Sequence, residues 1–119
     1  MPQNAESGCQ GLEHGYRNAD LIGALLGATR IANNSNEFRW KGRTVVIKTG
    51  SSVVVTRATL ARVATVVYGE ETASGWVLYE IDPATFEGLS VTSQSSKHNE
   101  NYRLVRRTQI RDNGRVISV

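Results

Sequence analysis

The sequence predicts an α+β or α/β domain built on a central mixed sheet of about five strands, with two main helices and a C-terminal β-hairpin. A length of 119 residues suits one domain with a single core. Short β-branched runs alternate with segments of helical apolar spacing, and turns rich in glycine and asparagine separate them. No apolar run is long enough to span a bilayer, so no membrane partner is expected.

Residues 1–17 are expected to form a flexible N-terminal lead-in, and residues 18–119 the single domain. The lead-in has neither the basic region nor the apolar stretch of a secretory signal, so the default location is cytoplasmic. Cys9 has no second cysteine with which to form a disulfide. With His14 and His98 it does not give the spacing of a structural zinc site, so these residues predict no metal or other cofactor.

A short helix is expected over residues 18–27, because Asn18 can cap it and apolar side chains recur four residues apart. A brief strand is expected at residues 29–32. Residues 33–36, three asparagines and a serine, predict a turn, since asparagine tolerates left-handed backbone.

Residues 37–49 predict a β-hairpin, which is the clearest local pattern in the chain. Residues 37–40 form its first arm and Lys41-Gly42 its tight turn. Residues 43–49 form a second arm rich in β-branched side chains, which favour strands.

The stretch from residue 50 to residue 67 predicts a connector followed by a helix. Residues 50–52, a glycine and two serines, form the connector. Thr56 is placed to cap a helix over residues 59–67. Residues 53–55, three valines, leave open the alternative that the extended segment continues.

An acidic loop is expected at residues 69–75, followed by a strand at residues 76–82. Pro83 ends this strand and can begin a one-turn helix that reaches Phe86. The polar run at residues 90–101 cannot bury enough apolar area to order itself, so a mobile loop is expected there.

Asn113-Gly114 is a strong hairpin signal, and it predicts paired strands at residues 102–111 and 115–119. The period of two along the first strand then aligns three arginines into a ladder suited to phosphates or to a carboxylate-rich protein. An alternative is that they only protect the edge of a solubilised hairpin. The exposed hairpin could also pair with its own copy in a homodimer.

Charge is divided into blocks along the chain. Residues 38–62 contain six cations and no acid, residues 63–96 five acids and no cation, and residues 97–119 a net charge of +4. Two basic segments separated by an acidic one suggest a fold that brings the basic parts onto one surface, as polyanion binding requires. Alternatively, the acidic segment docks against the basic segments of its own chain.

Trp40 lies between Arg39 and Lys41, where it can stack on a base while its neighbours hold phosphates. The alternative is that the indole is half-buried packing. The residues predicted to bind nucleic acid are Arg39, Trp40, Lys41, Arg43, Arg57, Arg103, Arg107 and Arg111.

Glu37 and Lys48, one on each arm of the first hairpin, resemble the PD-(D/E)xK restriction-endonuclease-like core. In that family an acid on one strand and an acid-x-lysine triplet on the next hold a divalent metal and position a water for phosphodiester attack. The order of helix, strand, hairpin, helix and strand over residues 18–82 is also similar. The resemblance implies catalytic roles for Glu37 and Lys48 and Mg²⁺ as cofactor; the alternative is that both are ordinary strand residues.

The acid of the triplet falls on Val46, so a metal would lose a charged ligand. Glu13 or Glu80 could supply a carboxylate from a neighbouring element. The sequence therefore favours a small, non-catalytic nucleic-acid-binding domain on a degenerate nuclease-like scaffold. One alternative is a protein-binding module that meets an acidic surface, such as a phage or mobile-element inhibitor of a defence protein; another is a Mg²⁺-dependent nuclease.

Overall fold

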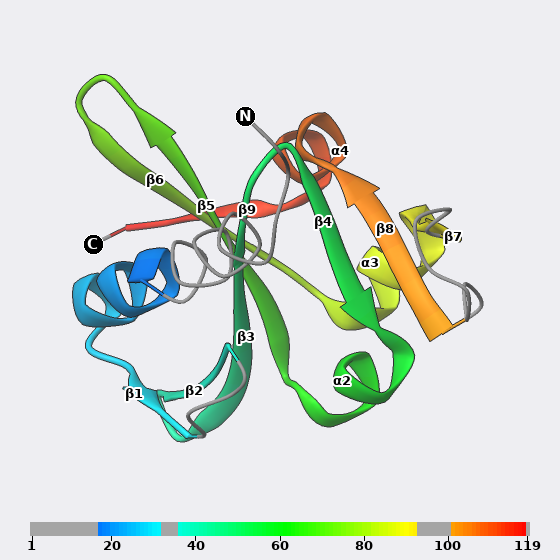
Figure 1. The fold of residues 1–119 in the computed structure, drawn as a ribbon, viewed down its shortest axis with the longest axis horizontal. Coiled ribbons are helices and arrows are strands. Elements are labelled where there is room, and N and C mark those ends of the chain that lie inside the picture. Colours follow the sequence, from blue (N-terminus) through cyan, green and yellow to red (C-terminus); the bar gives the residue numbers. More distant parts are fainter. Residues whose placement is uncertain (1–16, 32–35, 93–100, 119) are drawn as a thin grey trace, which may run out of the picture.

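The computed structural model describes residues 17–31, 36–92 and 101–118. Two sheets make up the fold, a six-stranded main sheet of order β1-β2-β3-β5-β6-β9 and a second sheet of order β4-β8-β7 (Figure 1). The predicted α+β class and mixed central sheet are confirmed. The main-sheet strands are β1 (Thr29–Arg30), β2 (Glu37–Trp40), β3 (Arg43–Thr49), β5 (Thr65–Thr72), β6 (Gly75–Ile81) and β9 (Arg115–Ile117). The other elements are β4 (Ser52–Thr56), β7 (Val91–Thr92), β8 (Tyr102–Arg106), a helix over residues 17–26, α2 (Arg57–Arg62), α3 (Pro83–Leu89) and α4 (Arg107–Asn113).

Neighbouring strands of the main sheet are antiparallel except β3 and β5, which run parallel. A parallel pair needs a crossover connection, because its strands cannot be joined by a tight turn. Here β4 and α2 form that connection. The chain therefore leaves the main sheet after β3, lays down the first strand of the second sheet, and returns to the main sheet at β5.

The first hairpin has the predicted boundaries. Trp40 pairs with Arg43, and the two turn residues between them both have positive φ, 53° at Lys41 and 74° at Gly42. Two successive left-handed residues suit the right-handed twist of a hairpin. This β2–β3 arm therefore lies within the main sheet, between β1 and β5.

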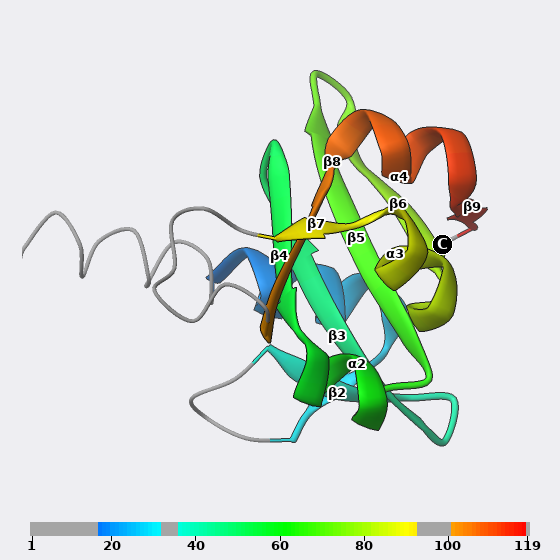
Figure 2. The same ribbon diagram turned by 90° about the vertical axis from the view of Figure 1, so that its right-hand side faces the viewer.

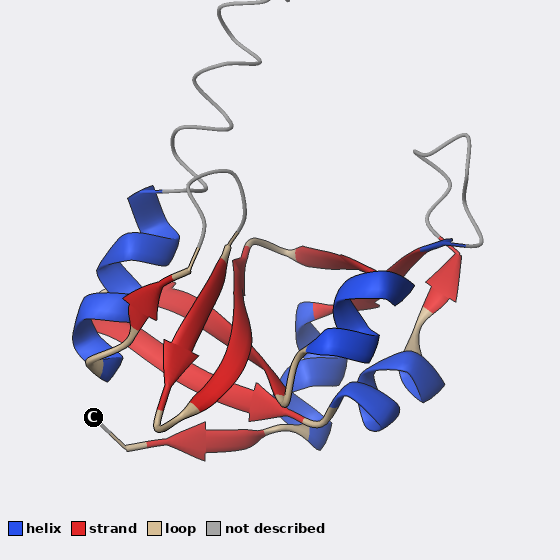
Figure 3. Cartoon of the chain, turned by 90° about the horizontal axis from the view of Figure 1, so that it is seen from below, coloured by secondary structure: helices blue, strands red, loops and turns tan. Residues whose placement is uncertain are grey.

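The elements that cover the main sheet lie on its two opposite faces (Figures 2 and 3), and a core of buried side chains lies on each face. The helix over residues 17–26 covers one face, where Ile22 packs with Trp40 and Ile47. The second sheet and α2–α4 cover the other face, where Val46 and Tyr68 meet side chains from β4 and β8. Since side chains alternate along a strand, Lys48 shares its face with Val46 and is directed toward the second layer.

The helix expected over residues 59–67 is shorter and begins earlier. Thr56 caps it as predicted, because its hydroxyl accepts a hydrogen bond from the Thr59 amide, but α2 ends at Arg62. The run that begins at Thr65 is instead the start of β5. β-branched side chains pack well on a pleated surface, and pairing with β3 and β6 overrides the weak helical pattern.

The acidic loop expected at residues 69–75 is also wrong. Glu70 and Glu71 lie on β5, which continues to Thr72 and forms a hairpin with β6.

After β6, α3 extends the predicted single turn as far as Leu89, with the Asp82 carboxylate accepting from the amides of Ala84 and Thr85. Of the expected loop at residues 90–101, Val91–Thr92 forms β7, and residues 93–100 lie outside the described residues. The same holds for residues 1–16 of the lead-in.

The C-terminal strands exist, but they do not pair with each other. Residues 107–113 form α4, β8 pairs with β4 and β7, and β9 pairs with β6. The Asn113-Gly114 turn is therefore wrong: the Asn113 amide donates to the Gln109 carbonyl, and Gly114 caps the helix. Ile110 packs this helix into the core, which a strand ending in a turn would not do.

Candidate functional site

Glu37 and Lys48 lie on the same face of the first hairpin. Glu37 is the cross-strand partner of Val46, and Lys48 lies two residues further along β3. Two residues is one full period of a strand, so both side chains are directed toward the second layer. The structure therefore brings together the two residues that the sequence singled out.

The Glu37 carboxylate is held by Arg62 of α2. Arg62 Nη2 lies 2.7 Å from Glu37 Oε2, and Arg62 Nε lies 3.3 Å from Oε1. This two-point contact raises the pKa of the Arg62 guanidinium. Arg62 Nη2 also donates to Thr59 Oγ1, which accepts a bond from the Thr56 hydroxyl. A continuous polar network therefore joins β2, α2 and the end of β4.

Lys48 is half-buried at this face. Burial lowers the pKa of its ammonium group, and the nearby carboxylate of Glu37 partly opposes that shift. Val46, in the position of the missing acid, is only 2% exposed and belongs to the core. The described face thus combines one carboxylate with two cations, a composition closer to an anion site than to a Mg²⁺ site.

Of the two acids that could replace the missing carboxylate, the one within the described residues, Glu80, does not reach this face. Glu80 is the partner of Val67 on β5, which belongs to the core on the opposite face of the sheet. Its carboxylate pairs with Arg115 at 3.3 Å. Glu13 lies outside the described residues. Within residues 17–31, 36–92 and 101–118, no three histidine, cysteine or acidic side chains gather as a metal site.

The cations at the tip of the first hairpin are arranged around Trp40. Lys41 Nζ lies 4.9 Å from the centre of its ring, and Arg43 Cζ lies 5.5 Å from it. The indole is 5% exposed, so it belongs to the core and leaves little surface for a base to stack on. Trp40 therefore fits the packing alternative, and the face of its ring contacts the two cations.

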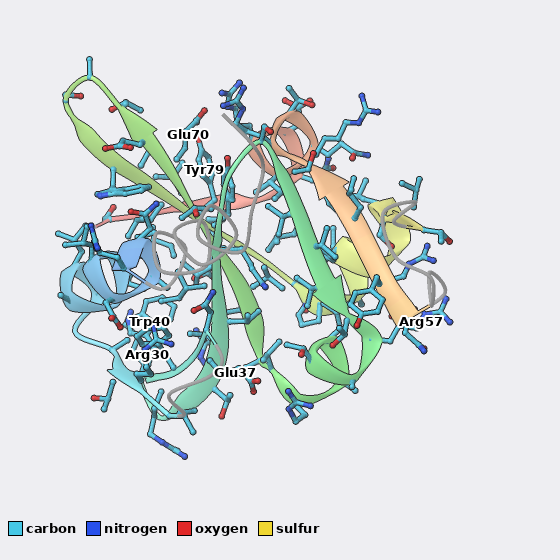
Figure 4. The ribbon with its side chains drawn as sticks, viewed as in Figure 1. Arg30, Glu37, Trp40, Arg57, Glu70 and Tyr79 are labelled. Carbon is cyan, nitrogen blue, oxygen red and sulfur yellow. The ribbon has the colours of Figure 1, made fainter. Side chains whose placement is uncertain are left out.

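Arg39, Lys41, Arg43 and Arg57 are exposed, and none of them forms an ion pair within the described ranges. Arg39 lies on β2 two residues after Glu37, so its side chain is on the same face of the hairpin as Glu37. Arg57 opens α2, away from the hairpin in Figure 4. Three of these four exposed cations therefore lie on the β2–β3 arm.

The C-terminal arginines have a different environment. Arg111 donates to both oxygens of Glu70, and Arg107 Nε lies 3.8 Å from Oε2 of the same carboxylate. The hydrogen bond from Arg111 lowers the pKa of Glu70. Arg103 is held by the Ser90 hydroxyl and carbonyl and by the Thr92 hydroxyl. The predicted ladder is therefore wrong: Arg103 lies on β8, while Arg107 and Arg111 lie on α4.

Sequence reasoning missed Arg62 as the partner of Glu37. The two residues are 25 positions apart, and α2 brings them together only after the crossover from β3 to β5 has formed. The alternative in which the acidic block docks against the chain's own basic residues is correct for Glu70 and Glu80. Figure 4 shows Glu37 and Glu70 at opposite ends of the main sheet, so the two ion-pair clusters are separate.

In comparisons with known proteins, the chain matches no protein-family model, no curated protein and no solved structure. None of the helices in the described part of the chain is long and apolar enough to cross a membrane. The geometry and charge of the chain itself are therefore the basis for inferring its function.

Proposed function

We propose that this chain is a non-catalytic nucleic-acid-binding domain that contacts the phosphate backbone through its β2–β3 hairpin. The observation that carries the proposal is the set of exposed cations without an ion-pair partner among the described residues, on and beside this arm. Cations that are not neutralised internally are available to displace counterions from a polyanion. The contact residues are Arg39, Lys41 and Arg43.

Rigidity supports the same proposal. Lys41 occupies a fixed left-handed position in the turn, and its ammonium group rests on Trp40 together with the Arg43 guanidinium. A binding surface that is ordered in advance loses less conformational entropy when the ligand arrives. The hairpin therefore presents its charge at a defined place, which a flexible basic tail would not do.

The absence of catalysis in this proposal follows from the charges around Glu37. Arg62 occupies both of its carboxylate oxygens, and Val46 provides no second acid. The order of elements, from the helix at 17–26 through β1, the hairpin and α2 to β5, supports a degenerate nuclease-like scaffold, with β4 as an additional strand. The cytoplasmic location expected from the sequence belongs to the same proposal.

The test is fluorescence anisotropy of labelled single- and double-stranded DNA and RNA across a range of salt. We expect Lys41→Ala with Arg43→Ala to weaken binding at least about tenfold and to reduce the salt slope by roughly 0.7–0.9 per lost phosphate contact. The matched control is Arg111→Ala with Arg115→Ala, which removes the same charge from ion-paired positions. Equal losses in the two variants, or no binding by the parent protein, would contradict the proposal.

The adjacency of Glu37 and Lys48 on one face supports a metal-dependent nuclease as second candidate. Gels of the same samples with and without Mg²⁺ distinguish the two. We expect intact strands, because a single paired carboxylate holds Mg²⁺ weakly. Mg²⁺-dependent cleavage that disappears in both Glu37→Ala and Lys48→Ala would establish the nuclease instead.

A further inference from the structure

The strand β4 is an edge strand without any of the usual protection. Its sequence is Ser-Val-Val-Val-Thr, and among the described strands it pairs only with β8. Edge strands are commonly blocked by a charged residue, a proline or a bulge, because their free backbone groups invite another chain to pair. β4 contains neither a charge nor a proline. One row of its amides and carbonyls is therefore a template for an added strand.

The free edge of β4 faces the hairpin side of the molecule. In Figure 1, β4 lies between β3 and β8. Both of its ends are tied down there. The Tyr68 hydroxyl donates to the Gly50 carbonyl at 2.6 Å just before β4 begins, and the network from Thr56 through Thr59 and Arg62 reaches Glu37 where β4 ends. An added strand would therefore lie on the side that carries Lys48.

Cations stand at both ends of this uncharged strand. Arg106 is the β8 partner of Ser52 at one end, and Arg57 follows Thr56 directly at the other. Both are exposed, and neither has an ion-pair partner within the described ranges. Between them, the outward face is aliphatic, because Val54, Leu104 and the 59%-exposed Val91 are aligned across the three strands.

We infer that the free edge of β4 binds an extended segment of a partner protein by strand addition, and that this segment has an apolar centre and acidic residues at both ends. Backbone pairing with β4 would supply affinity, while Arg57 and Arg106 would select the charge of the flanks. An aliphatic centre with a charged rim is the usual composition of a protein interface. This surface is separate from the Lys41 and Arg43 tip proposed for nucleic acid.

Charge also decides against a second copy of this chain as the occupant. In an antiparallel β4 pair centred on Val54, Ser52 of one chain would face Thr56 of the other. At each end of the pair, Arg57 of one copy would then lie opposite the end of β4 in the other copy, with Arg106 of that other copy one strand further away on β8. Like charges brought together at an interface oppose association. A segment with acidic flanks meets the same ends with favourable pairs.

The experiment uses a labelled nonapeptide with alternating valine and threonine in its centre and two acidic residues at each end. A second peptide replaces the acids with lysines. We expect the full-length protein to bind the acidic peptide in anisotropy measurements and not the lysine peptide. Within residues 52–56, exchange should slow at the amides that face the free edge of β4 when the acidic peptide is bound, because those amides gain partners.

The variant Arg57→Ala with Arg106→Ala should weaken peptide binding by about tenfold or more, since two flanking charge pairs are lost. Lys41→Ala with Arg43→Ala should leave peptide binding unchanged, so this inference can fail while the proposed function holds, and the reverse. Equal binding of the acidic and lysine peptides would overturn the inference. So would unchanged exchange at residues 52–56, or protection of those amides by an oligonucleotide instead of the peptide.

Discussion

The first hairpin and the C-terminal segment carry similar excesses of positive charge in the sequence, yet the fold treats them differently. On the hairpin, Lys41 and Arg43 rest on an aromatic ring and have no carboxylate partner in the described structure. In the C-terminal segment, Arg111 is paired with Glu70 and Arg115 with Glu80. A block of basic residues therefore keeps its cations free of ion pairs only where the fold brings no acid to it.

The difference comes from the geometry of α4 and β9. Residues four positions apart share one side of a helix, so Arg107 and Arg111 both reach Glu70. The antiparallel register of β6 and β9 places Arg115 directly opposite Glu80. Acids of the β5–β6 hairpin thus pair with Arg107, Arg111 and Arg115, whereas the turn of the first hairpin lies beside the start of β5, at the end of that strand away from Glu70.

Gly114→Ala should have the largest effect, because it disturbs the junction between α4 and β9 in the C-terminal segment. A Cβ there would lie 2.7 Å from the Ile110 carbonyl oxygen and 3.1 Å from that of Glu80, and backbone atoms cannot move aside as a side chain can. We expect a loss of roughly 3 kcal/mol in the free energy of unfolding, measured by urea denaturation. Gly42→Ala is the matched change in the first hairpin, where the φ of +74° is strained but the space is open. It should cost about 1 kcal/mol, and a larger loss at Gly42 would contradict the prediction.

Glu70→Gln should make the C-terminal segment resemble the first hairpin, in that its cations lose their carboxylate partner. Removing the carboxylate releases Arg107 and Arg111 from their shared partner. Polyanion affinity should rise severalfold, with a steeper salt dependence, because two more cations can contact phosphates. Glu71→Gln removes the same charge from the neighbouring exposed residue, which has no ion pair in the described structure. If both variants gain affinity equally, only the net charge matters.

The ion pair between Glu70 and Arg111 should make a contribution to the free energy of unfolding that is lost in acid. Arg111 lowers the pKa of Glu70 in the folded state, so the unfolded chain binds more protons as the pH falls below the ordinary glutamate value of about 4.3. The stabilisation is present above that pH and is lost as the pH falls through the folded-state pKa. Unfolding measured across the acid range should show a shallower decline in Glu70→Gln than in the parent. Identical declines would mean that the pair contributes nothing to stability.

Lys48→Met should have the smallest effect. It tests how a lysine of the first hairpin changes the stability of the protein at alkaline pH. Burial lowers the pKa of Lys48 below the ordinary lysine value of about 10.4, so between those two values the unfolded chain binds more protons. Stability of the parent protein should therefore rise with pH in that window, and the variant should lack the rise. Lys41→Met, which changes an exposed lysine of the same hairpin, should keep it. Circular dichroism during urea titration at several alkaline pH values provides the measurement.

The parts of the fold that could be predicted from the sequence are those governed by neighbouring residues. Lys41-Gly42 followed by a β-branched arm specified the first hairpin, Thr56 specified a helix cap, and Pro83 marked the end of β6. Each signal acts within a few positions of the chain, where backbone preference and local hydrogen bonds dominate.

The parts that could not be predicted depend on long-range partners. Asn113-Gly114 is a good turn sequence in isolation, but Ile110 gains more by packing α4 into the core. The pairing of Glu37 with Arg62 requires β3 and β5 to be side by side, and the pairing of Glu70 with Arg111 requires α4 to pack against β6. The sequence indicated that Glu37 and Lys48 would share a hairpin, but it did not reveal that an arginine would occupy the carboxylate.

The unprotected edge of β4 also bears on how the protein is made. Its only partner among the described strands is β8, and in that pairing Tyr102 follows Thr56 by 46 positions. At typical synthesis rates of about 5–20 residues per second, roughly 2–9 s pass before the ribosome adds that partner. Throughout this interval a nascent chain exposes three consecutive valines with both edges open, a segment suited to aggregation or chaperone capture. We therefore expect the yield of folded protein in cells to depend on the rate of translation between β4 and β8.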